Sequence, residues 1–141
     1  MTLQPESAYE FTLAALCVWR EARGESAEGK RAVAWVIRNR ALTPSWWGSG
    51  WSGVILKPFQ FSSFNSSDPN AVKWPAKGDP AWMECLNAAA EVFEGEAQDD
   101  PTRGATHYYD DSIPKPEWTR AMIPVLKVGR LNFYKETLSN V

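Results

Sequence analysis

The sequence predicts a mainly helical α+β fold with a small antiparallel sheet, built as a single domain over residues 1–141. Two patterns support this fold class: three segments have helical apolar periodicity, and short strand-like runs follow only near the C-terminus. The composition, 44% hydrophobic and 23% charged residues, is that of a globular protein and excludes a disordered chain.

The first helix is expected over about residues 8–23. Ser7 and Glu10 have the spacing of a capping box, and Gly24 is expected to end the helix. The segment is apolar on most of its sides, which is typical of a buried central helix. Glu21 lies at the flank of its main apolar face.

Two further helices have clear start signals. Ser26 is expected to cap a helix over residues 27–41, and Asp79 to cap one over residues 80–94. Gly95 is expected directly after the third helix, at the C′ position.

Residues 43–77 have little periodicity but hold four of the eight tryptophans. Disorder fits such an aromatic segment poorly, so we expect a folded loop region that forms one wall of a cleft, with a short helix near residues 51–56. Three tryptophans are expected in the core: Trp19, Trp35 and Trp82. The remaining excess of tryptophan indicates that some face a ligand.

The sheet is expected from three short runs. They cover residues 105–109, 122–128 and 131–134, and a turn at Gly129–Arg130 joins the last two.

Charge and cysteine content exclude several classes of function. The net charge is −2 with no basic block, so nucleic-acid binding is not expected. Two cysteines suffice for neither a disulfide scaffold nor a zinc site, and we expect no metal or other cofactor.

The apolar run 11–19 is too short to span a bilayer, and no secretory segment is visible. We therefore expect a monomer that is made in a cytoplasm and does not insert stably into a membrane.

Glu21 is a candidate general acid. Burial on an apolar helix raises the pKa of a carboxyl group, and a protonated carboxyl can donate its proton to a glycosidic oxygen. A structural ion pair with a nearby arginine is the alternative.

Glu25 is a candidate second carboxylate, although Gly24 is expected to break the helix between Glu21 and Glu25. The alternative is that Glu25 stabilises the start of the second helix through the helix dipole.

Other residues leave two rival functions open. Cys17 and the single histidine, His107, could form a nucleophile pair, although a cysteine on an apolar helix is more often a core residue. The exposed aromatic residues suit sugar rings, whose C–H faces stack on aromatic planes while their hydroxyls need polar neighbours such as Gln60 and Ser62. A non-catalytic glycan-binding module would show the same aromatic pattern.

Four segments in order resemble the SleB-like cell-wall hydrolases, the family of the spore-cortex-lytic enzymes and some phage endolysins. They are Glu21-Ala22-Arg23-Gly24-Glu25 with the helix that follows it, Pro58-Phe59-Gln60-Phe61-Ser62, Asp100-Pro101-Thr102 with Gly104-Ala105 and the aromatic pair Tyr108-Tyr109, and Val128-Gly129 with Asn132-Phe133-Tyr134. Three features depart from the family pattern: Asp110-Asp111, Arg130-Leu131, and a longer, more aromatic insert from Trp46 to Trp51.

The resemblance implies a lysozyme-like or lytic-transglycosylase-like domain that cleaves the bond between N-acetylmuramic acid and N-acetylglucosamine in peptidoglycan strands, as a transglycosylase or a muramidase. It implies that Glu21 is the catalytic acid, with Glu25 or Asp110 available to activate water in a muramidase. The expected substrate-binding residues are Gln60, Phe61, Ser62, His107, Tyr108, Tyr109, Trp46 and Trp47. It also suggests a phage endolysin that lyses bacterial cells after release through a holin.

Overall fold

The structure is a computed structural model that describes residues 5–57 and 61–137. Its helices are α1 (Pro5–Ala22), α2 (Ala27–Leu42), α3 (Trp51–Ile55) and α4 (Pro80–Glu94), and its strands are β1 (His107–Asp110), β2 (Met122–Val128) and β3 (Leu131–Glu136). Short 3₁₀ turns are η1 (Ser62–Phe64), η2 (Pro69–Val72), η3 (Ala97–Asp99) and η4 (Glu117–Ala121). The mainly helical α+β class is confirmed.

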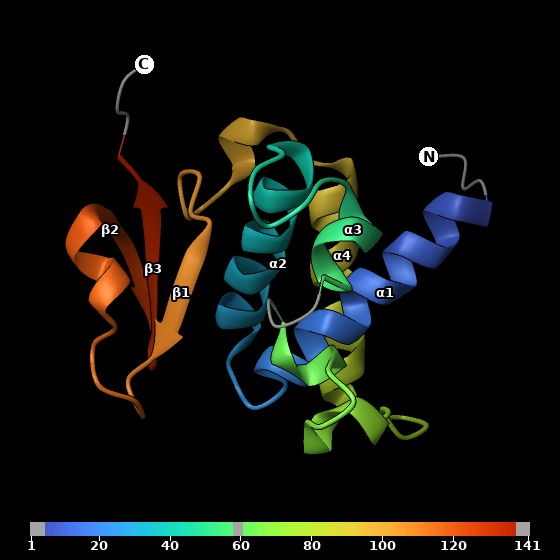
Figure 1. Cartoon of the computed structure of the whole chain (residues 1–141). Coiled ribbons are helices and arrows are strands. Elements are labelled where there is room, and N and C mark those ends of the chain that lie inside the picture. The colour runs from blue at the N-terminus through green and yellow to red at the C-terminus, as the bar shows by residue number, and fades with distance from the viewer. Residues whose placement is uncertain (1–4, 58–60, 138–141) are drawn as a thin grey trace.

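Helix α2 lies between the sheet on one side and α1 and α4 on the other (Figure 1). Most of its length is buried, including Trp35, Val36 and Ile37 with no exposed surface. Helix α1 is deeply buried only in its second half, from Ala14 to Arg20. The prediction of a buried central helix therefore applies to α2 more fully than to α1.

Local capping signals set two of the three long helices as predicted. The Ser26 side chain accepts a hydrogen bond from the Gly29 backbone N–H at the start of α2. The Asp79 side chain accepts one from Ala81 at the start of α4. The capping box at Ser7 is wrong, because α1 already begins at Pro5 and Ser7 lies inside it.

Gly95 ends α4 for a reason that differs from the prediction. Its φ of −80° is open to any residue, so it is not a left-handed C′ glycine. A Cβ at this position would lie 2.8 Å from the carbonyl oxygen of Glu91 and 3.3 Å from the indole of Trp35. The glycine is therefore required by lack of space, first against the last turn of α4 itself and then against Trp35 of α2, rather than by backbone conformation.

The sheet is antiparallel with strand order β1-β3-β2. Gly129, with φ +56°, makes the turn between β2 and β3, a conformation that favours glycine. Pro124 lies on the edge strand β2, next to a register shift, where a missing backbone N–H is tolerated. The β2 and β3 runs are confirmed, whereas β1 begins two residues later than expected.

The aromatic loop region after α2 is folded, and the predicted short helix is present as α3. Trp51 stacks on Phe93 of α4 with ring centroids 4.1 Å apart, which ties the loop to the helical layer. Trp19 and Trp35 are buried as predicted, and Trp82 is half-buried against the same core. Among the described residues, no helix is long and apolar enough to cross a membrane.

Candidate active site

Glu21 lies in the last turn of α1, where the helical layer meets the sheet. The hydroxyl of Tyr108, on β1, donates a hydrogen bond of 2.9 Å to Glu21 Oε1, although the two residues are 87 positions apart. Tyr108 also packs on Phe133 of β3, with ring centroids 5.5 Å apart. The sheet therefore presents one fixed donor to the end of α1.

The surroundings of Glu21 favour its protonated form. Burial raises the pKa of Glu21 above 4.5 and outweighs the nearby donors of Ser63 and Tyr108, which lower it. Burial also raises the pKa of Tyr108 well above 10, so its hydroxyl keeps the proton that it donates. Burial thus shifts Glu21 toward the protonated state that a general acid needs.

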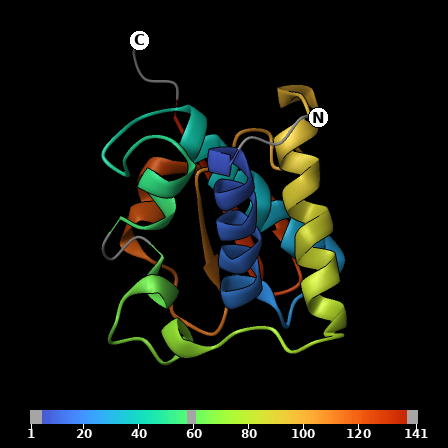
Figure 2. The same cartoon turned by 90° about the vertical axis from the view of Figure 1, so that its right-hand side faces the viewer.

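Arg20, in the last turn of α1, and Arg23, just after the helix, hold the segment that carries Ser63. Arg20 Nε donates to the Lys73 carbonyl at 3.2 Å, and its guanidinium lies over the rings of Phe64 and Trp74. Arg23 donates to the side chain of Asn70 at 2.8 Å. Figure 2 shows this green segment passing beneath the C-terminal end of α1.

The Ser63 hydroxyl is the remaining polar group at the carboxyl. Ser63 is buried, and both its hydroxyl and its backbone N–H act on Glu21. Within the described residues, its Oγ makes no hydrogen bond of good geometry. The hydroxyl is therefore positioned to bond to a carboxylate once Glu21 loses its proton.

The loop before β1 is held by the Asp100 carboxylate. It accepts hydrogen bonds from the backbone N–H of Thr102 at 2.7 Å, the Thr102 hydroxyl at 2.6 Å and the Gly104 N–H at 2.8 Å. Asn39 of α2 donates to the same carboxylate at 2.9 Å and to the Ala105 carbonyl at 2.9 Å. These bonds set where β1 starts, and thereby where Tyr108 meets Glu21.

Arg40 brings a buried positive charge to the same region. Its guanidinium lies between the rings of Trp47 and Phe61, at 5.7 and 5.3 Å, and its Nε donates to the Thr106 carbonyl at 2.7 Å. Burial lowers the pKa of Arg40, while the acidic groups of Tyr108, Cys17 and Glu21 act in the opposite direction. An arginine stays charged in this setting, so it favours a negative charge on Glu21 after proton transfer.

Glu25 does not share a helical face with Glu21, because α1 ends at Ala22. Its carboxylate lies 3.4 Å from Arg130 of the β2–β3 turn, and Arg130 also lies 3.7 Å from Asp110. Asp110 is two residues after Tyr108 and faces the same side of the sheet. The two carboxylates proposed to activate water are thus joined through one arginine.

Two predicted substrate-binding residues are buried instead. Trp47 has no exposed surface, because its indole N–H donates to the carbonyls of Arg40 and Thr43 at 3.0 Å each and so caps the end of α2. Phe61 is 3% exposed under the Arg40 guanidinium. Trp46, the neighbour of Trp47, is 56% exposed and remains available to a ligand. Gln60 lies outside the described residues, and Ser62 is described only as part of η1.

His107 and Tyr109 point away from Glu21. Side chains alternate along a strand, so the two residues that flank Tyr108 face the opposite side of the sheet. There Tyr109 stacks with Tyr134, and His107 lies among Trp46, Trp47 and Trp118. Of the two adjacent tyrosines, only Tyr108 lies beside Glu21, and the substrate contacts of Tyr109 and His107 stay predictions.

The structure argues against a Cys-His pair. Cys17 is a free, fully buried thiol, and burial raises its pKa well above 9.0, so it stays a neutral thiol. Cys85 is also free, hence the two cysteines do not form a disulfide. His107 makes its described contacts with Thr106 and with tryptophan rings.

Sequence reasoning missed most of the residues around the carboxyl. Arg20 and Arg23 were considered only as ion-pair partners of Glu21, Ser63 only as a polar neighbour for sugar hydroxyls, and Arg40 only as a cation at a helix end. One signal was available: Arg20 and Arg23 lie within two residues of Glu21 on a predicted helix that is mostly apolar, so each of them needed a polar partner from elsewhere.

A half-buried carboxyl between a helical layer and a small antiparallel sheet is consistent with a lysozyme-like domain. The chain belongs to the cell wall hydrolase family, whose profile matches residues 24–134. The predicted resemblance is confirmed. The matched range begins just after Glu21, so the match itself says nothing about that residue.

Relatives and solved structures agree with this membership. The chain is 29% identical to a spore cortex-lytic enzyme of Halalkalibacterium halodurans, over 86% of this chain and 33% of that protein. It is 31% identical to that of Oceanobacillus iheyensis, over 94% of this chain and 44% of that protein. It thus spans less than half the length of these relatives.

Two solved structures of SleB catalytic domains share the fold. The catalytic domain of Bacillus cereus SleB has a TM-score of 0.73 and 29% identity, covering 92% of this chain and 91% of that domain. The catalytic domain of the germination-specific lytic transglycosylase SleB of Bacillus anthracis has a TM-score of 0.73 and 27% identity, covering 95% and 100%. The lysozyme-like fold is confirmed.

Proposed function

We propose that this chain is a peptidoglycan lytic transglycosylase and that Glu21 is its catalytic acid. The observation that carries the proposal is the half-buried Glu21 side chain, whose pKa is raised by desolvation and whose Oε1 accepts a hydrogen bond from Tyr108. The similar proteins support the reaction class, since they are spore cortex-lytic enzymes and, in one solved domain, a lytic transglycosylase.

In the first step, Glu21 protonates the oxygen that joins N-acetylmuramic acid to N-acetylglucosamine, and the bond from that oxygen to C1 of the muramic acid breaks. Negative charge then develops on Glu21, where the Tyr108 hydroxyl, Ser63 and the charge of Arg40 stabilise it. In the second step, Glu21 takes the proton of the muramic 6-hydroxyl as O6 bonds to C1. This closes a 1,6-anhydro ring, consumes no water and restores the acid.

A muramidase is the second candidate, because two more carboxylates lie nearby. Glu25 and Asp110 share Arg130, and either could take a proton from an attacking water. In that case the second carboxylate is essential, whereas the transglycosylase needs only Glu21.

Mass spectrometry of soluble fragments from purified peptidoglycan separates the two. For the transglycosylase we expect anhydromuramyl ends, lost in Glu21→Gln and retained in the matched variant Glu25→Gln. Reducible muramic ends that are lost in both variants would instead support the muramidase. Full activity of a folded Glu21→Gln protein would refute the assignment of Glu21.

The two rival functions have their own controls. A Cys-His amidase or endopeptidase would cut the stem peptide and lose activity in Cys17→Ala. We expect Cys17→Ala to keep its activity, because the thiol is buried and protonated. A non-catalytic glycan-binding module would bind peptidoglycan without releasing any fragments.

We also propose that the protein lyses bacterial cells as a phage endolysin, made in the host cytoplasm and acting as a monomer without nucleic acid. Expression in a bacterial host with and without a holin tests this role. Lysis that requires both the holin and Glu21 is expected, and lysis without the holin would contradict it. Substrate contacts of Gln60 and Ser62 stay predictions, to be checked by alanine substitution.

A further inference from the structure

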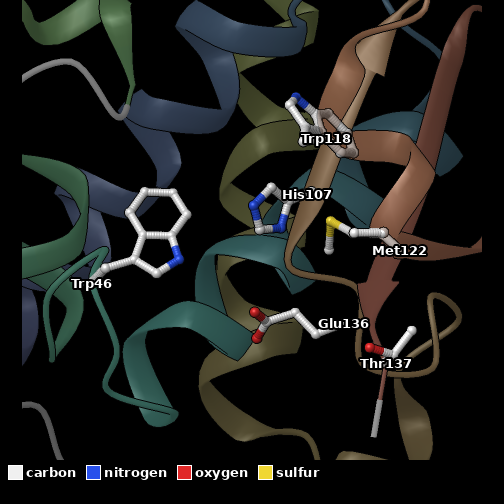
Figure 3. A pocket seen from close by; sticks show the side chains of 7 residues that line it. Trp46, His107, Trp118, Met122, Glu136 and Thr137 are labelled. Carbon is white, nitrogen blue, oxygen red and sulfur yellow. The ribbon is translucent and has the colours of Figure 1, made fainter. Parts of the chain in front are cut away.

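A second pocket opens on the face of the sheet that points away from Glu21. Its volume is about 420 Å³, within the range of small-ligand sites. Figure 3 shows side chains from four parts of the chain turned toward a common space. The lining residues are Trp46, His107, Trp118, Ala121, Met122, Glu136 and Thr137.

Aromatic rings form the walls of this pocket. The ring of His107 lies 5.9 Å from that of Trp46 and 5.1 Å from that of Trp118, measured between centroids. Trp46 is 56% exposed, yet its ring packs edge-on against the buried, hydrogen-bonded Trp47 at 5.5 Å. The exposed indole is thus held in place before any ligand arrives, which lowers the entropic cost of binding.

The polar groups of the pocket suit an uncharged ligand rich in hydroxyls. Burial and the charge of Arg40 lower the pKa of His107 to about 4, so its ring is neutral at physiological pH. His107 Nδ1 is hydrogen-bonded to the Thr106 hydroxyl at 2.9 Å, which leaves Nε2 for a ligand. Glu136 adds a carboxylate acceptor and Thr137 a hydroxyl, and the carboxylate disfavours anionic ligands.

We propose that this pocket is a second saccharide site, which binds an uncharged N-acetylhexosamine ring of a glycan strand between Trp46 and Trp118. A pyranose offers apolar C–H faces to the two indoles and hydroxyl groups to His107, Glu136 and Thr137. Trp46 comes from the aromatic insert that departs from the family pattern. The proposal rests on the proposed function only in taking peptidoglycan as the source of the glycan.

Strand β1 separates the two sites, since Tyr108 faces one and His107 the other. A glycan at the second site therefore does not occupy the cleavage site. On an insoluble wall with many strands, a second contact raises the effective concentration of substrate at Glu21.

The single histidine of the chain provides a direct probe. We would follow the imidazole NMR signals of His107 in the Glu21→Gln variant while adding a tetramer of N-acetylglucosamine. We expect these signals to shift saturably. In Trp46→Ala and Trp118→Ala we expect the affinity to fall at least about tenfold, the scale of losing one aromatic anchor.

Two further variants control for folding and for general surface effects. Trp46→Phe keeps an aromatic plane and should bind with intermediate affinity. Met83→Ala, on α4, changes an apolar side chain that is also 56% exposed and should bind like its parent. Unchanged affinity in folded Trp46→Ala, or no saturable shift of His107, would overturn the proposal. So would a shift caused by the free stem peptide but not by the sugar tetramer.

A pelleting assay with intact peptidoglycan extends the test to the natural polymer. Trp46→Ala in the Glu21→Gln background should bind several-fold more weakly than Glu21→Gln alone. The NMR titration and the pelleting assay both measure binding without turnover, so they remain interpretable even if Glu21 is not the catalytic acid. If instead the second site does not bind sugar, the mass spectrometry of peptidoglycan fragments is unaffected.

Discussion

Replacing Glu21 by Gln should stabilise the folded protein at neutral pH. The pKa of Glu21 is raised above 4.5 by burial, so in the folded state the charged carboxylate is disfavoured relative to the unfolded chain. Between the unfolded and the folded pKa, the folded protein binds more protons than the unfolded chain, and stability falls as pH rises through that window. Gln does not titrate and avoids this loss.

The gain should be that of a typical single stabilising substitution, about 0.5–2 kcal/mol. For a chain of this size, 1 kcal/mol corresponds to a change in Tm of roughly 3–4 °C. We therefore expect Glu21→Gln to melt about 2–8 °C higher than the wild type at pH 8. The Gln side chain still accepts the hydrogen bond from Tyr108, so little is lost in exchange.

Thermal melts at a series of pH values test this reasoning. The stability gain of Glu21→Gln should vanish below about pH 4, where the Glu21 carboxyl of the wild type is protonated in both the folded and the unfolded protein. The gain should grow as pH rises above this value. Glu25→Gln is the matched control: Glu25 pairs with Arg130, which is 65% exposed, so its loss should cost at most about 1 kcal/mol. A Glu21→Gln protein that is less stable than the wild type at every pH, or whose gain does not depend on pH, would refute the argument.

Three further predictions concern the residues around the carboxyl. Tyr108→Phe removes the hydroxyl that donates to Glu21 at 2.9 Å, so kcat should fall about 10- to 100-fold. Because that hydrogen bond lowers the pKa of Glu21, its loss should move the alkaline limb of the pH–rate profile to higher pH. An unchanged profile would contradict this role. Asp100→Ala leaves four donors without their acceptor and should cost about 2–4 kcal/mol in urea unfolding, whereas a cost below about 1 kcal/mol would show that the loop does not depend on it. NMR titration of His107 should give a midpoint near pH 4, and a midpoint near 6.5 would show that the pocket is more hydrated than the structure indicates.

The sequence by itself determined the features that depend on neighbouring residues. Ser26 and Asp79 cap their helices as predicted, because a cap needs only the side chain and the first turn that follows it. Gly129 turns β2 into β3 because one residue must adopt a positive φ. Glu21 could be singled out because a carboxyl on an apolar helix is unusual in itself.

Only the tertiary structure decided how those elements form the candidate site. Trp46 and Trp47 are adjacent and chemically identical, yet one is exposed and the other caps α2 inside the core. Tyr108 and Tyr109 likewise differ only in which face of β1 they occupy. The physical reason is that burial, the pKa of Glu21 and its hydrogen bond to Tyr108 all depend on contacts between segments far apart in the chain, which local patterns do not encode.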